Sequence, residues 1–123
     1  METRKLIFAA LAGSLLAVGC NRAESPKEVQ EDVADAQQDA TQETAEARED
    51  VAASYDQGAG AVAENQYDLA ITEAEGKHKV AMEACEAMSG AEQEECKARA
   101  DEELAAAKQQ AEALRTPPAT TTP

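Results

Sequence analysis

The chain has 123 residues, of which 11 are basic and 25 are acidic, and its formal net charge at pH 7 is −14. Aromatic residues make up 2% of it, and alanine supplies more than half of the hydrophobic residues. This balance excludes a nucleic-acid-binding surface, which needs clustered lysine and arginine to neutralise phosphates. It also excludes electrostatic binding to anionic lipid. A large apolar core is excluded because few side chains are big enough to fill one.

The first residues have the pattern of an export signal. Arg4 and Lys5 form a short basic region, and residues 6–18 form an apolar one. The apolar stretch is too short to cross a bilayer as a helix, for which about 20 residues are needed. It ends in small residues at positions 17–19, which also fit an ordinary cleavage site. The pattern therefore predicts a signal peptide over residues 1–19.

A cysteine follows the small residues directly. The sequence Ala17-Val18-Gly19-Cys20 resembles the lipobox of bacterial lipoproteins. The resemblance implies that the Cys20 thiol is diacylglycerol-modified, and that the mature chain begins there and is held by acyl chains such as palmitate. Each buried CH₂ of such a chain contributes about 0.8 kcal/mol. Asn21 follows Cys20, and in lipoproteins of this kind a residue other than aspartate implies the outer membrane, facing the periplasm. The alternative is ordinary cleavage, which leaves Cys20 as a free thiol.

The mature chain begins with a polar tether at 20–24, and a helix is predicted over 25–57. Ser25, Pro26 and Glu28 form a capping box with proline at the first helical position. The glycines at 58 and 60 end the pattern. One face of this helix repeats every 11 residues, a period that favours a straight or slightly right-handed arrangement. The face consists of Val29, Val33, Ala36, Ala40, Thr44, Ala47, Val51 and Tyr55.

A helical hairpin is predicted over 61–115, because small and apolar residues follow heptad spacing on both sides of a Ser-Gly break at 89–90. Folding the two segments antiparallel about this break sets the register. It places Cys85 opposite Cys96, Ala81 opposite Ala100, His78 opposite Glu103, Ala74 opposite Ala107 and Tyr67 opposite Leu114. Whether the helix at 25–56 packs on this hairpin stays open.

The cysteines Cys85 and Cys96 are predicted to form a disulfide. Lipidation of Cys20 leaves an even pair in an exported, disulfide-permissive compartment. A bridge closing a loop of about 12 residues contributes about 3 kcal/mol in the chain-entropy model. A redox-active pair is the alternative, although redox motifs usually place their thiols closer together. Zinc bound by both cysteines and His78 would lack the usual closely spaced ligand pairs.

A second resemblance covers about residues 67–113. The segments Lys79-Val80-Ala81, Ser89-Gly90 and Cys96-Lys97, with Cys85 between the first two, and Ala98 and Ala100 after the last, are similar to a set of small proteobacterial envelope proteins. These proteins are mostly described as hypothetical, or loosely as TolA-like cell-envelope proteins. The resemblance implies an exported protein with a stapled hairpin, and it implies no activity.

Together these patterns predict an all-α protein: an extended helix, then a disulfide-stapled hairpin, then a disordered Thr/Pro tail at 116–123. No catalytic constellation, cofactor motif or calcium loop is present in the sequence. We therefore expect a non-enzymatic, lipid-anchored envelope protein without a cofactor or metal. Its partners would be the membrane, through Cys20, and a protein or a second copy of the chain. The protein or second copy would bind at the small and apolar face of the hairpin. The candidate contact residues are Tyr67, Ile71, Leu104 and Leu114.

The alternative function rests on the acidic 11-residue repeat at 25–57. In composition this repeat resembles the amphipathic repeats of late-embryogenesis-abundant stress proteins, although it lacks their lysine-rich side. That resemblance implies a partly disordered, stress-protective periplasmic protein. The two readings differ in how much helix they expect in plain buffer.

Overall fold

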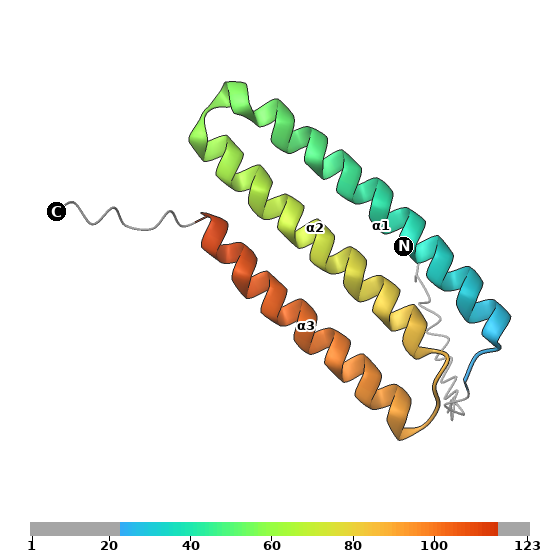
Figure 1. Cartoon of the computed structure of the whole chain (residues 1–123). Helices are drawn as coiled ribbons and strands as arrows, with labels where there is room; N and C mark the ends of the chain where they lie inside the picture. Colours follow the sequence, from blue (N-terminus) through green and yellow to red (C-terminus); the bar gives the residue numbers. More distant parts are fainter. Residues whose placement is uncertain (1–22, 116–123) are drawn as a thin grey trace, which may run out of the picture.

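The computed structural model describes residues 23–115, which form three long helices and no strands (Figure 1). Helix α1 spans Pro26–Ser54, the short 3₁₀ turn η1 spans Tyr55–Gln57, α2 spans Ala59–Cys85 and α3 spans Ala91–Arg115. The predicted all-α class and the antiparallel disulfide-stapled hairpin are confirmed, since Cys85 and Cys96 are joined between α2 and α3. The expectations for the signal peptide, Cys20 and the tail lie outside the described residues.

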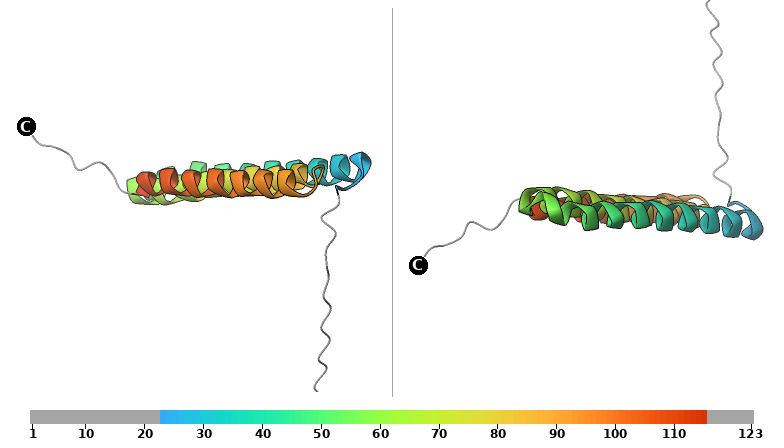
Figure 2. Two further views of the ribbon diagram at one scale, coloured as in Figure 1. Left: turned by 90° about the horizontal axis from the view of Figure 1, so that it is seen from below. Right: turned by 90° about the horizontal axis from the view of Figure 1, so that it is seen from above.

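The three helices form one flat layer with α2 in the middle. Helices α1 and α3 each pack along α2 and make no contact with each other. Seen edge-on, from above or below the view of Figure 1, the three helices lie in one plane (Figure 2). The sequence left open whether the first helix packs on the hairpin, and the structure shows that it folds back antiparallel along α2.

Helix α1 begins as its sequence predicts. The Ser25 hydroxyl oxygen accepts a hydrogen bond from the Glu28 N–H at 3.3 Å, and the Ser25 N–H donates to the Glu28 carboxylate at 3.1 Å. The two bonds satisfy N–H groups that a helix start otherwise leaves unpaired. The helix ends slightly before the expected residue 57, because the chain tightens into η1 and then turns at Gly58. Gly58 has a φ of 106°, a conformation that favours glycine.

The face of α1 that repeats every 11 residues is the face that packs on α2. Seven of the eight predicted positions are buried or half-buried, from Val29 to Val51. The exception is the last one: Tyr55 is 65% exposed, and Ser54 is fully buried in its place. The Ser54 hydroxyl donates to the Val51 carbonyl oxygen at 2.7 Å, so it is buried with a partner. At the turn into α2 the small serine fits between the helices, and the tyrosine ring points to solvent.

Gly76 explains how closely α1 approaches α2. It lies in the middle of α2 and is buried. A Cβ atom built there would lie 2.7 Å from the Cβ of Ala40 and 3.4 Å from its Cα. Glycine costs about 1 kcal/mol relative to alanine inside a helix, and here the missing side chain lets two helix backbones come together.

Candidate interaction surface

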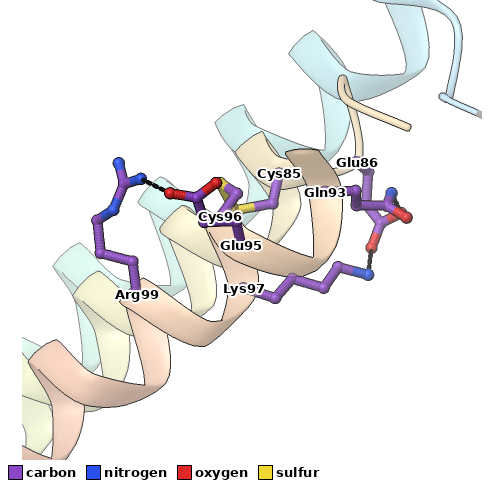
Figure 3. The surroundings of a disulfide bond; sticks show 7 residues. All are labelled: Cys85, Glu86, Gln93, Glu95, Cys96, Lys97 and Arg99. Atoms are coloured by element: carbon purple, nitrogen blue, oxygen red, sulfur yellow. Dashed lines mark hydrogen bonds and ion pairs between the residues drawn. A yellow bond between two sulfur atoms is a disulfide. The ribbon is translucent and has the colours of Figure 1, made fainter. Parts of the chain in front are cut away.

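The disulfide ties together the loop end of the hairpin (Figure 3). The Cα atoms of Cys85 and Cys96 are 5.7 Å apart, and Cys85 is 1% exposed. Beside the bridge, the Gln93 amide donates to the Glu86 carboxylate at 2.7 Å, and Lys97 forms an ion pair with the same carboxylate. The bridge is therefore shielded at Cys85 and flanked by a small polar network, which suits a structural cross-link.

The four candidate contact residues lie in different environments. The Arg115 guanidinium sits 4.6 Å from the centre of the Tyr67 ring, so this ring is engaged within the chain. Ile71 is half-buried. Leu104 is half-buried and lines a small hollow between α2 and α3. Leu114 is 42% exposed at the end of α3. Of the four, Leu114 is the one most available to another molecule.

The only histidine contacts a different carboxylate from the one expected. His78 Nε2 lies 2.7 Å from the Asp101 carboxylate, whereas the sequence register placed Glu103 opposite it. The level along the hairpin was right, since Glu103 lines the same small hollow as His78. Both carboxylates are exposed, and the one that contacts His78 is Asp101. The register fixes which turns of two helices meet. The direction in which each side chain leaves its helix then determines which carboxylate reaches the histidine. No nucleophile lies in this pair, so it makes no catalytic dyad.

Ion pairs cross both helix–helix contacts near the surface. Lys79 lies 2.7 Å from Asp39 across α1 and α2. The hydrogen bond and the charge of Asp39 raise the pKa of Lys79. Further pairs across the helices are Arg48–Glu73 at 2.9 Å, Lys108–Glu75 at 2.8 Å and Arg115–Glu64 at 3.3 Å. Exposed pairs of this kind contribute about 0–1 kcal/mol each, so they select the helix register more than they stabilise the fold.

An open groove runs along one face of the layer, between α1 and α2. Its volume is about 770 Å³. A smaller hollow of about 330 Å³ lies between α2 and α3, and both are lined by Glu73 and Lys77 of α2. The two hollows therefore flank the same ridge. The floor and rims of the larger one are mostly small side chains: Gln37, Ala40, Thr41, Thr44, Ala45, Arg48, Gly76, Val80, Ala81 and Ala84 complete its lining. In a compact three-helix bundle a third helix would fill such a groove, but here α3 packs on the other edge of α2.

The chain enters the layer beside the hairpin loop. The Glu24 N–H donates to the Glu86 carbonyl oxygen at 2.8 Å, which joins the start of the described chain to the end of α2. Partial loss of solvent raises the pKa of Glu24, and the nearby carboxylates of Asp32, Glu86 and Glu28 raise it further. Nothing in the sequence pattern signalled this contact, because a backbone hydrogen bond leaves no mark on residue identity.

Within residues 23–115, no three histidine, cysteine, aspartate or glutamate side chains are placed to hold a metal ion. The three helices described here are also too polar for any of them to cross a membrane. Comparison of the chain with protein-family models, curated proteins and solved structures finds no match.

Proposed function

We propose that this protein is a non-enzymatic lipoprotein, anchored to the outer membrane through Cys20 and facing the periplasm, with a structural or protein-interaction role. The observation that carries the proposal is the use of the three cysteines. Cys85 and Cys96 are joined to each other, so Cys20 is the remaining thiol, and it stands directly after the small residues of a lipobox-like sequence. A three-helix unit tied by a disulfide suits the oxidising compartment that such an anchor implies.

The interaction role is supported by the shape of the layer. A single layer of helices buries less apolar surface than a bundle, and the groove between α1 and α2 leaves small side chains such as Ala40 and Val80 open to another molecule. Neither the His78–Asp101 pair nor the disulfide supplies a nucleophile with its base. Contact with other molecules is therefore better supported than chemistry.

The anchor is tested by the intact mass of the protein extracted from the membranes of its own cells without reductant. We expect the mass of residues 20–123 plus acyl chains, less two hydrogens for the bridge. The control is Cys20→Ala, which should remain unacylated. A bare mass for residues 20–123 would contradict the anchor, and two intact thiols at 85 and 96 would contradict the staple.

The interaction role is tested by photo-crosslinking in intact cells. A photoreactive residue at Ala45, an exposed residue lining the groove, should capture a defined protein product. The matched control is Asp68, an exposed residue of α2 that does not line the groove. Equal products from both positions would contradict a role for the groove.

A further inference from the structure

The described chain starts at one end of the layer, and its first contact fixes which end this is. The hydrogen bond from the Glu24 N–H to the Glu86 carbonyl oxygen holds the entering chain against the hairpin loop. The start of α1, the end of α2 and the start of α3 all lie at this end, and the turn at Gly58 lies at the other (Figure 1). We name the first the loop end and the second the turn end.

Only a short length of chain separates Cys20 from the loop end. Ala23 is three positions after Cys20, and even fully extended this stretch spans at most about 11 Å. Helix α2, with 27 residues, is about 40 Å long. A lipid attached at Cys20 can therefore reach a bilayer beneath the loop end while the turn end stays beyond its reach.

The exposed apolar side chains are distributed in a way that opposes a flat orientation on lipid. Among the described residues, the large apolar side chains that are exposed are Tyr55, Met88 and Leu114. Met88 is 41% exposed in the loop, whereas Tyr55 and Leu114 lie at the turn end. None of these three lies on the long faces of the layer, so Met88 is the large exposed apolar side chain nearest to the anchored surface.

Charge decides which lipid surface fits. The loop end is rich in carboxylates: a backbone hydrogen bond holds Glu24 beside Glu86, and Glu92 and Glu94 lie in the first turn of α3. Lys97 is already paired with Glu86. An anionic surface would repel this end, and a zwitterionic one would not.

We infer, on the basis of the lipid anchor proposed above, that the loop end rests on a zwitterionic lipid surface with Met88 against the lipid. The layer then stands upright, and Tyr55 and Leu114 are presented about 40 Å from the bilayer. The disulfide lies at the membrane-proximal end, and the groove between α1 and α2 runs away from the membrane.

The chain contains no tryptophan, so single tryptophans report on its orientation. Met88→Trp and Tyr55→Trp place the reporter at exposed positions at opposite ends. Each variant, as residues 20–123, is coupled through the Cys20 thiol to a maleimide lipid in vesicles of brominated phosphatidylcholine. The bromine atoms quench tryptophan that touches the lipid. Circular dichroism of each variant verifies that the helices are intact.

We expect Met88→Trp to lose most of its emission on coupling and Tyr55→Trp to keep its emission. Equal quenching of both would mean that the layer lies flat, and quenching of neither would mean that the loop end stands off the bilayer. Either result overturns the inference. Replacing part of the phosphatidylcholine with an equally brominated anionic lipid should weaken the quenching of Met88→Trp, and unchanged quenching would overturn the choice of lipid.

The chemical tether separates this inference from the proposed function. Coupling at Cys20 is made in vitro, so the orientation is measured whether or not the cell acylates the protein. The intact mass of the native protein tests acylation alone. Uncoupled protein mixed with the same vesicles is the control, and quenching there would show binding that does not depend on the anchor position.

Discussion

The two contacts made by α2 are held by different means. Against α3, a disulfide joins Cys85 to Cys96 at one end, and the guanidinium of Arg115 covers Tyr67 at the other. Against α1 there is no covalent link, and the contact depends on the missing side chain of Gly76 beside Ala40. The comparison teaches that a chain with few large apolar residues can hold its helices either by a cross-link or by close approach of backbones.

The largest expected effect comes from removing the cross-link. The variant Cys85→Ala/Cys96→Ala should lose about 3 kcal/mol of unfolding free energy, because its unfolded chain is no longer constrained. Urea denaturation followed by circular dichroism measures the loss, and reduction of the wild type should reproduce it. Cys20→Ser alone should leave the midpoint unchanged. An equal midpoint for the double variant would mean that the α2–α3 contact is held by packing alone.

A bulky residue at position 76 attacks the other contact. Gly76→Leu should cost about 2 kcal/mol, because its Cβ would overlap that of Ala40 and force α1 away from α2. Gly60→Ala is the matched control: no atom lies within 4 Å of its added Cβ, and it should stabilise the helix slightly. The smaller change Gly76→Ala should also lower the free energy of unfolding, and adding Ala40→Gly to it should recover part of that loss. A stabilising effect of Gly76→Leu would rule out the close approach.

The polar network beside the disulfide should have a smaller effect. Glu86→Ala leaves the amide of Gln93, which is 2% exposed, without its partner, and should cost about 1–2 kcal/mol. Glu95→Ala, which removes an exposed carboxylate from the Glu95–Arg99 pair, serves as the control and should cost about 0.5 kcal/mol or less. Both residues are drawn in Figure 3. Thermal unfolding of the two variants side by side measures the difference, and equal losses would argue against a role for the network.

The start of α1 should show the smallest loss and a pH dependence. Ser25→Ala should cost about 1 kcal/mol, as removal of an N-cap typically does. Hydrogen bonds from the Ser25 side chain and backbone lower the pKa of Glu28. Its stabilising contribution is therefore complete above the unfolded-state pKa and is lost as the pH falls through the lower folded-state value.

An acid titration of helicity distinguishes the wild type from the cap variant. The wild type should lose stability as Glu28 is protonated, and Ser25→Ala should flatten this part of the curve. Parallel curves for the two proteins would mean that the capping box does not set the protonation of Glu28.

Local features of the fold could be predicted from the spacing of residues along the sequence. The capping box at Ser25 and the packing face of α1 follow from residues that recur three or four positions apart. The pairing of Cys85 with Cys96 follows from the Ser-Gly break midway between them. The end of that face at Ser54 could not be predicted, since it depends on how the chain turns into α2.

The placement of α1 was beyond the sequence pattern. The face of α2 that receives α1 includes Gly76 and Val80, and it mixes small and polar residues without a clear apolar period. A glycine inside a helix can have a packing reason, but the sequence does not name the helix that packs there. The partner of His78 was missed for a related reason, because register sets the level and not the direction of a side chain.

The disulfide lies near the start of α3, so α3 is fixed covalently to α2 at this end and not at the other. When the helix separates from α2, the contacts of Arg115 with Glu64 and Tyr67 at the far end can open while the disulfide holds. Because α2 and α3 belong to one chain, redocking of α3 is intramolecular and does not depend on protein concentration. Helix α1 is linked covalently to α2 through the turn at Gly58, at the opposite end of the layer, and the chain before it is held by the hydrogen bond from Glu24 to Glu86. The covalent links of the two outer helices to α2 therefore lie at opposite ends of this central helix.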